Sequence, residues 1–254
     1  MTINFQAIPA FSDNYIWAIR TAGDGCVLVD PGQAEPALAY LDRHALRLEG
    51  LLLTHHHADH ICGVAGLREQ HPAPAWGPDD PRMPADMQRV TEGERVEIGG
   101  LAFDVLETPG HTRSHIVFYT PGAVLCGDTL FSAGCGRLFE GTPGQMQASF
   151  DKLAALPDET RVYCAHEYTA ANCRFAQAVE PDNPALAERA REVEALRADG
   201  HITLPTTIAE EKTFNPFLRT REPAVIDAAA AREPAAGSGA DAVFGVIRRW
   251  KDSF

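Results

Sequence analysis

Several kinds of segment are absent from this sequence, and each absence excludes a class of protein. No stretch approaches the ~20 apolar residues of a membrane span, so no membrane association is expected. Residues Met1 to Pro9 lack a basic stretch followed by an apolar one, so no secretory signal is visible and a cytoplasmic protein is expected. The six cysteines form no C-x-x-C pair, which argues against a zinc ribbon or a thioredoxin-like motif and favours free thiols.

Positive charge is also scarce. The chain has 22 lysines and arginines against 35 aspartates and glutamates, which gives a net charge of −13. Nucleic-acid binding needs a basic surface, so this balance argues against a nuclease or an RNA-processing protein. A local basic patch for a small anionic ligand remains open. With 254 residues, 45% of them hydrophobic, the chain can bury a large core as one domain or as a domain with an appendage.

Possible metal ligands are concentrated just after residue 54. The apolar run Gly50–Leu53 is typical of a buried strand, and four histidines and one aspartate occupy the six positions 55–60. The ends of strands are usual places for the sites of layered α/β proteins. Imidazole and carboxylate are ligands that zinc, manganese and iron accept, so this segment predicts half of a metal site. Its candidate ligands are His55, His57, Asp59 and His60.

Three further side chains have similar surroundings. His111, Asp128 and His166 each follow an apolar, strand-like run and lie beside small residues that let the backbone turn. Together with the first cluster they predict the other half of the metal site. His56 lies between the candidate ligands and is expected to support them or simply to pack. His115 lies on or beside a strand and is expected to be a hydrogen-bonded structural histidine.

Secondary-structure signals divide the chain into two parts. Strand-like runs recur up to residue 164, and Thr142–Gln145 has the form of a helix capping box with proline at the first helical position. The proline-rich stretch from His71 to Pro84 is expected to be a loop, and a helix is expected from Pro36 to Leu48. From about residue 170 onward helical patterns dominate. We therefore expect a mixed α/β domain at 1–169 and a smaller all-helical domain at 170–254.

The order H-x-H-x-D-H, followed by His111, Asp128 and His166, resembles the metallo-β-lactamase superfamily. The resemblance implies a four-layer αββα sandwich and two divalent metal ions. It implies that the first ion is bound by His55, His57 and His111, and the second by Asp59, His60 and His166, with Asp128 bridging the pair. Zinc is the expected metal, and iron and manganese are the alternatives.

Two divalent ions that share a water lower its pKa towards about 7, which makes hydroxide available at neutral pH. The natural reaction class is therefore hydrolysis of an ester, amide, thioester or phosphodiester. No serine nucleophile is needed, and the sequence contains no G-x-S-x-G elbow. Ala170 stands where an H-E-x-x-H metalloprotease motif starting at His166 would need its second histidine.

Further segments resemble glyoxalase II, the hydroxyacylglutathione hydrolases. They are Phe11–Tyr15, Phe131–Thr142, His166–Thr169, Glu211–Arg219 and Arg248–Asp252. This resemblance implies hydrolysis of S-(2-hydroxyacyl)glutathione thioesters, notably S-lactoylglutathione, to glutathione and D-lactate, the second step of methylglyoxal detoxification. A metal-bridging hydroxide would attack the thioester carbonyl. The catalytic side chains would be Asp128, which bridges, and Asp59, which orients or deprotonates the nucleophile.

Glutathione carries two carboxylates, which an acidic protein must meet with local positive charge. The resemblance implies that Arg137, Arg248 and Lys251 grip its glycine end and that Tyr168 donates a hydrogen bond. Arg137 stands where many relatives have lysine, which changes the geometry of the charge. Phe139 stands where some relatives have tyrosine, so a hydrogen bond from that position is absent.

Two other functions stay open. A glutathione-persulfide dioxygenase of the same superfamily would use one iron and oxygen, but the helical C-terminal segment and the final arginine and lysine favour the hydrolase. A non-catalytic metal-binding module is disfavoured because no ligand of the motif is missing. A monomer is expected.

Overall fold

The computed structural model describes residues 3–254, which form two compact units. Unit 1 consists of Met1–Glu107 and Ser114–Gly127, of which the first two residues are not described. Unit 2 consists of Thr108–Arg113 and Asp128–Phe254. Within residues 3–254, no helix has the length and apolar character needed to cross a membrane.

The first sheet of unit 1 has the strand order β1-β2-β3-β4-β5-β6. Its first three strands pair antiparallel and the remaining strands pair parallel. The strands are β1 (Asn4–Ala10), β2 (Asn14–Arg20), β3 (Gly25–Val29), β4 (Arg47–Leu52), β5 (Ala75–Pro78) and β6 (Gln88–Val90). All five residues of β3, which pairs antiparallel with β2 and parallel with β4, are buried, as expected for a strand covered on both faces.

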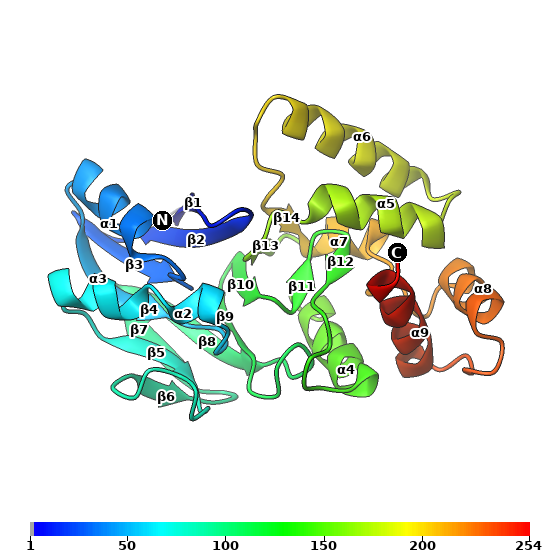
Figure 1. Ribbon diagram of the computed structural model, residues 1–254, viewed down its shortest axis with the longest axis horizontal. Coiled ribbons are helices and arrows are strands. Elements are labelled where there is room, and N and C mark those ends of the chain that lie inside the picture. Colours follow the sequence, from blue (N-terminus) through cyan, green and yellow to red (C-terminus); the bar gives the residue numbers. More distant parts are fainter. Residues whose placement is uncertain (1–2) are drawn as a thin grey trace. The chain divides into compact units, whose positions relative to one another are not determined.

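Helices cover one face of this sheet. Helix α1 (Ala34–Arg43) inserts Ala37 and Leu41 into the core, and α3 (Val64–Gln70) inserts Val64 and Leu67. Both helices lie over β3 and β4 (Figure 1). The short helix α2 (Ala58–Ile61) precedes α3.

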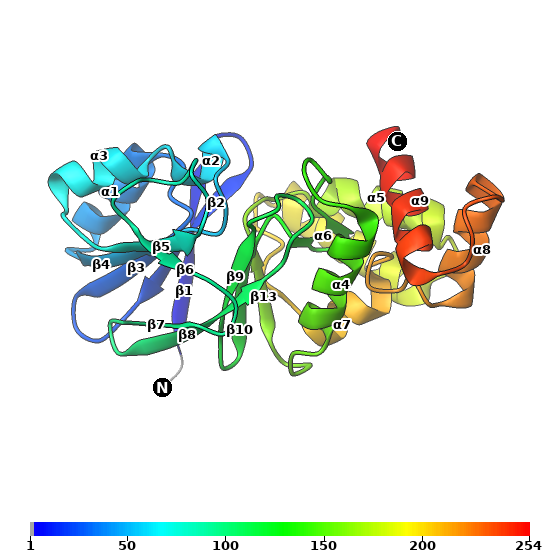
Figure 2. The same cartoon turned by 90° about the horizontal axis from the view of Figure 1, so that it is seen from below.

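A second set of strands lies on the other face of the first sheet. It runs in the antiparallel order β10-β9-β8-β7, with β7 (Arg95–Ile98), β8 (Leu101–Glu107), β9 (Ile116–Thr120) and β10 (Ala123–Gly127). A Cβ on Gly50 of β4 would lie 2.2 Å from Cδ1 of Ile98 on β7, so the two sheets are in close contact there. Unit 1 therefore has a helix layer and two sheet layers (Figure 2).

Unit 2 is mostly helical. Its strands form two antiparallel pairs, β11 (Leu130–Phe131) with β12 (Gly134–Cys135), and β13 (Arg161–Cys164) with β14 (Thr206–Thr207). Its helices are α4 (Pro143–Ala154), α5 (Thr169–Val179), α6 (Pro184–Ala198), α7 (Ile208–Phe214), α8 (Pro223–Arg232) and α9 (Ala240–Asp252). Four phenylalanines form the centre of its core, with ring centroids 5.0–6.4 Å apart: Phe150, Phe175, Phe217 and Phe244.

The predicted start of α4 is confirmed, because Thr142 and Gln145 form its capping box. The side chain of Asn183 caps α6. Two predictions were wrong. The stretch from His71 to Pro84 contains strand β5, which pairs parallel with β4 and buries Ala75 despite its prolines. The helix predicted to extend to Leu48 ends at Arg43, and Leu48 belongs to strand β4.

Candidate metal centre

The candidate ligands of unit 1 follow strand β4 directly. The chain leaves the sheet at Leu52, buries Thr54 and His55 completely, and enters helix α2 at Ala58. The imidazole centroid of His55 lies 4.0 Å from that of His60 and 4.6 Å from that of His57. The rings of His55, His57 and His60 therefore lie together.

A buried carboxylate at the end of β3, Asp30, orients two of these imidazoles. Oδ1 of Asp30 accepts a hydrogen bond from the backbone N–H of Thr54 at 2.8 Å, and Oδ2 accepts from the Thr54 hydroxyl at 2.7 Å. Nδ1 of His60 lies 3.0 Å from the same Oδ2. Because an ionised carboxylate only accepts, Nδ1 of His60 carries the proton and Nε2 has the lone pair for a metal.

The same network fixes His55. The Thr54 hydroxyl gives its only proton to Asp30, so its oxygen accepts from Nδ1 of His55 at 3.1 Å. Asp30, His55 and His60 lie close enough together to hold a metal ion as a group. Since both oxygens of Asp30 already accept hydrogen bonds, however, its role is to orient the two imidazoles and leave their Nε2 atoms for the metal.

Asp59, the carboxylate of the cluster, lies in the first turn of α2. Its Oδ2 accepts a hydrogen bond from the side-chain amide of the buried Asn14 at 3.0 Å and lies 3.5 Å from Nε2 of His60. Asn14 thus fixes the orientation of a carboxylate that faces the lone pair of a candidate ligand, His60.

In unit 2 the candidate ligands are centred on Asp128. Each of its carboxylate oxygens faces one imidazole: Oδ2 lies 3.3 Å from Nε2 of His111, and Oδ1 lies 3.4 Å from Nε2 of His166. Nδ1 of His111 is 2.8 Å from the backbone carbonyl of Arg137, which can only accept, so Nε2 of His111 also has the lone pair. A carboxylate with an imidazole Nε2 on each oxygen is the arrangement that a ligand shared by two cations requires.

Aromatic rings surround His166 just after the end of β13. The ring of Tyr168 stacks on the His166 imidazole with 4.6 Å between centroids and 8° between planes. Phe131 contacts the same imidazole edge-on at 5.8 Å. These contacts hold the ring plane of His166.

His56 and His115 lie beside the candidate ligands of unit 1. Nδ1 of His56 is 3.9 Å from Oδ2 of Asp80, and hydrogen bonds from Arg82 hold the pKa of that carboxyl well below its usual range. His115 is fully buried, and its ring stacks on His55 at 4.8 Å. Gly127 has φ +48°, and a Cβ there would lie 2.9 Å from Nε2 of His115, so a larger residue would disturb this packing.

The candidate substrate-binding residues of unit 2 differ in exposure. The side chain of Arg137 is 58% exposed, with Nε 3.2 Å from Oδ1 of Asp252 and its guanidinium 5.9 Å from the Phe139 ring centroid. Tyr168 is 36% exposed. Arg248, by contrast, is only 5% exposed and donates to the carbonyl of Cys135 at 2.8 Å.

Lys251 is half-buried next to Arg248. Its ammonium donates to Oδ1 of Asn172 and lies 5.3 Å from the centroid of the Phe175 ring. Burial, and to a lesser extent the positive charge of Arg248, lower the pKa of Lys251 to about 8. Arg137, Arg248 and Lys251 therefore bring three basic groups to one end of α9.

Sequence reasoning missed several residues that hold the candidate ligands. Asp30 follows an apolar strand just as the ligands do, so the same signal was available for it. Asn14 and Asn172 gave no such signal, because an amide carries no charge and its partners are distant in sequence.

Comparison with known proteins agrees with both parts of the chain. Residues 11–166 match the family model described as "Metallo-beta-lactamase superfamily", and residues 167–254 match "Hydroxyacylglutathione hydrolase C-terminus". The chain is 50% identical over 249 residues to a hydroxyacylglutathione hydrolase of Idiomarina loihiensis, covering 98% of each. It is 51% identical over 257 residues to one of Pseudomonas aeruginosa, covering 99% of this chain and 100% of the relative.

Two solved structures are similar as well. ETHE1 from Myxococcus xanthus has a TM-score of 0.65 at 32% identity, over 86% of this chain and 84% of that one. TTHA1623, described in a di-iron-bound form, has a TM-score of 0.62 at 28% identity, over 85% of this chain and 100% of that one.

The fold and the two sets of ligands define a metallo-β-lactamase-type protein, a mixed α/β fold with two sheets. The chain belongs, more narrowly, to the hydroxyacylglutathione hydrolase family. The predicted αββα fold with a helical C-terminal domain is thereby confirmed. Imidazole Nε2 atoms facing carboxylates fit a divalent transition metal, and with the fold they support divalent metal binding.

Proposed function

We propose that this protein hydrolyses S-(2-hydroxyacyl)glutathione thioesters, notably S-lactoylglutathione, to glutathione and a 2-hydroxy acid. The observation that carries the proposal is Asp128 with an imidazole on each carboxylate oxygen, on a chain whose relatives along its whole length are hydroxyacylglutathione hydrolases. D-Lactate would be the acid, as in the second step of methylglyoxal detoxification.

The proposed cofactor is a pair of divalent metal ions, zinc in the first place, with iron or manganese as alternatives. His55, His57 and His111 would bind one ion, and Asp59, His60 and His166 the other, with Asp128 shared. The di-iron form of TTHA1623 supports two ions in a protein of this fold. Bound ions of this kind supply hydroxide at neutral pH and stabilise negative charge on oxygen.

The chain's own groups would then orient the reaction. Asp59, fixed by Asn14, would orient the attacking water and accept its proton. His55 and His60 are held with Nε2 available, so no tautomer change is needed before metal binds. Asp59 and Asp128, the proposed catalytic carboxylates, each lie within 3.5 Å of the imidazole of a proposed ligand, which supports these roles.

Glutathione would be bound through its glycine carboxylate. Arg137 is exposed enough to bond it directly, and the ammonium of Lys251 and the hydroxyl of Tyr168 would add donors. Arg248 is almost fully buried, so it would attract the carboxylate through its positive charge rather than through direct contact. Phe139, 59% exposed, offers a ring but no hydroxyl to the substrate.

We further propose that the protein works as a monomer in the cytoplasm, and that a catalytic domain at 1–169 precedes a substrate-binding domain at 170–254. All six cysteines are free thiols, in keeping with a reducing compartment. The ends of the two family-model matches, at 166 and 167, support a boundary near these positions.

The experiment combines elemental analysis with two assays on the same metal-defined protein. We expect two transition-metal ions per chain and release of glutathione from S-lactoylglutathione. One iron per chain, with oxygen consumed on glutathione persulfide, would favour the dioxygenase instead. Neither reaction in metal-saturated protein would exclude both.

A further inference from the structure

Residues Phe131–Arg137 are here called the hairpin segment. Its last residue, Arg137, contacts His111, a proposed metal ligand. The segment includes the end of β11, the left-handed residue Ala133 at φ +56°, and β12. Its last carbonyl, that of Arg137, accepts the hydrogen bond from Nδ1 of His111. The position of this backbone therefore decides how the His111 ring is oriented.

The hairpin segment has few backbone partners of its own, because β11 and β12 are two residues each. It is held instead by polar side chains from helices later in the chain, beside which it lies (Figure 1). The amide of Asn172 on α5 donates to Ser132, and that of Asn215 donates to Phe131 and Gly134, each at 3.0 Å. The buried carboxylate of Glu211 on α7 accepts from the N–H of Ala133, also at 3.0 Å.

Arg248 holds the end of the segment nearest to His111. Its Nη1 donates to the carbonyl of Cys135 at 2.8 Å and lies 3.5 Å from that of Gly136, while Nη2 donates to Asp252 at 3.1 Å. The guanidinium also lies 5.6 Å from the centroid of the Phe217 ring. Two carbonyls directly before Arg137 are thus fixed by one buried side chain.

The backbone at this point has little room to move. A Cβ on Gly136 would lie 1.9 Å from the carbonyl oxygen of Asp128 and 3.0 Å from Nδ1 of His111. The N–H of Gly136 donates to Thr129 at 3.2 Å. Any shift of the segment would therefore be transmitted to both His111 and Asp128.

We propose that Arg248 is a positioning residue for the metal ligand His111. By holding the carbonyls of Cys135 and Gly136 it fixes the Arg137 carbonyl, which keeps the proton of His111 on Nδ1 and its Nε2 available to metal. The helical part of the chain then contributes to the metal site as well as to substrate binding. The inference rests on the proposed function, because it assigns His111 as a ligand.

A role in substrate binding alone makes a different prediction. If Arg248 only binds the substrate carboxylate, its replacement raises KM and leaves His111 unchanged in protein without substrate. A positioning role changes His111 before any substrate or metal is added. The two roles can therefore be separated in substrate-free protein.

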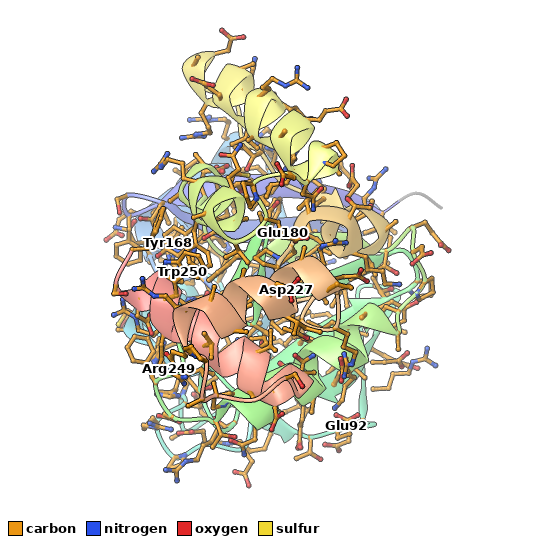
Figure 3. The ribbon with its side chains drawn as sticks, turned by 90° about the vertical axis from the view of Figure 1, so that its right-hand side faces the viewer. Glu92, Tyr168, Glu180, Asp227, Arg249 and Trp250 are labelled. Carbon is orange, nitrogen blue, oxygen red and sulfur yellow. The ribbon has the colours of Figure 1, made fainter. Side chains whose placement is uncertain are left out.

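The chain offers a matched control in the next residue. Arg249 lies on the same helix and is labelled in Figure 3, but it is exposed and pairs with Glu233 at 2.6 Å. Arg249→Met removes the same charge from the same helix without touching the hairpin segment. Arg137→Met removes the side chain but keeps the backbone carbonyl that His111 uses.

The test measures the Nδ1–H resonance of His111 by NMR in metal-free protein labelled with ¹⁵N-histidine, and zinc affinity by chelator competition. His111→Gln assigns the resonance. With Arg248→Met we expect faster exchange of this proton with solvent and zinc affinity lower by about 10–100-fold, as for other groups that support a ligand. Arg249→Met and Arg137→Met should keep both properties within about twofold of wild type.

Arg248→Lys protects the test against a variant that does not fold. It keeps the charge but loses the planar fork, so exchange of the His111 proton should fall between wild type and Arg248→Met. If Arg248→Lys, or a folded Arg248→Met, matches Arg249→Met in both readouts, the inference is overturned. The NMR readout needs neither metal nor thioester, so its failure is distinguishable from failure of the proposed hydrolysis.

Discussion

Replacing Asp30 by asparagine should weaken metal binding although Asp30 is not among the proposed ligands. Oδ2 of Asp30 accepts from two donors, the Thr54 hydroxyl and Nδ1 of His60, at 2.7 and 3.0 Å. In the variant, the side-chain oxygen of the asparagine can still accept from the backbone N–H of Thr54. Its NH₂ group then faces the Thr54 hydroxyl and Nδ1 of His60, so donors face donors. His60 can then satisfy the amide only by moving its proton to Nε2, which removes the lone pair meant for the metal.

The expected magnitude follows from the loss of one supporting carboxylate. Partners of this kind are worth about 10–100-fold in metal affinity, or roughly 1.4–2.7 kcal/mol. A buried hydrogen bond to a charged group contributes about 1.5–3 kcal/mol to folding, so unfolding of the metal-free variant should require less denaturant by a comparable free energy. Excess zinc should restore most of the activity, because the ligands themselves remain.

The assay is chelator competition for zinc, followed by thioester hydrolysis at increasing zinc concentration. Asp24→Asn is the matched control, because Asp24 is exposed and its carboxylate forms a long surface ion pair with Arg47, 3.9 Å away. Equal zinc affinity in the two variants would refute the orienting role of Asp30. Loss of activity that excess zinc does not restore would also contradict it.

Three further predictions concern the proposed ligands and substrate contacts. Asp128→Ala should lose metal and activity together, measured by elemental analysis and turnover; full metal content would remove Asp128 from the ligand set. Arg137→Met should raise KM about fivefold with kcat nearly unchanged, because an exposed charged contact contributes up to about 1 kcal/mol; an unchanged KM would place substrate elsewhere. Since the pKa of Lys251 is lowered to about 8, its ammonium form is lost as pH rises through 8, and KM should then rise by up to about tenfold per pH unit. Lys251→Arg, which keeps its charge, should remove this rise, whereas a rise that persists would assign it to another group.

The candidate ligands were predictable because they lie just after the ends of strands. A buried strand shows as an apolar run, and the residues just after it are free to face the edge of the sheet, so His55, Asp128 and His166 could be picked out by neighbours alone. Strand β5 was not predictable in this way. Its burial depends on parallel pairing with β4, which local composition does not encode.

The two adjacent arginines of α9 cannot be distinguished from local sequence. Arg248 and Arg249 are the same residue type in the same helix, yet one is 5% exposed and bonds the hairpin segment while the other pairs with Glu233 at the surface. Successive helical residues point about 100° apart, so the packing of the helix decides which one is buried. The sequence motif includes both arginines but does not indicate which of them is buried.

The sequence by itself determined the types of candidate ligand and their order along the chain, because histidine and aspartate can bind divalent metals wherever they are placed. The tertiary structure alone decided which nitrogen of His60 and of His111 has the lone pair for a metal. Nδ1 of His60 is paired with Asp30, 30 positions away, and Nδ1 of His111 with the carbonyl of Arg137, 26 positions away. A tautomer is set by a partner a few ångströms from the ring, and only folding brings such distant partners that close.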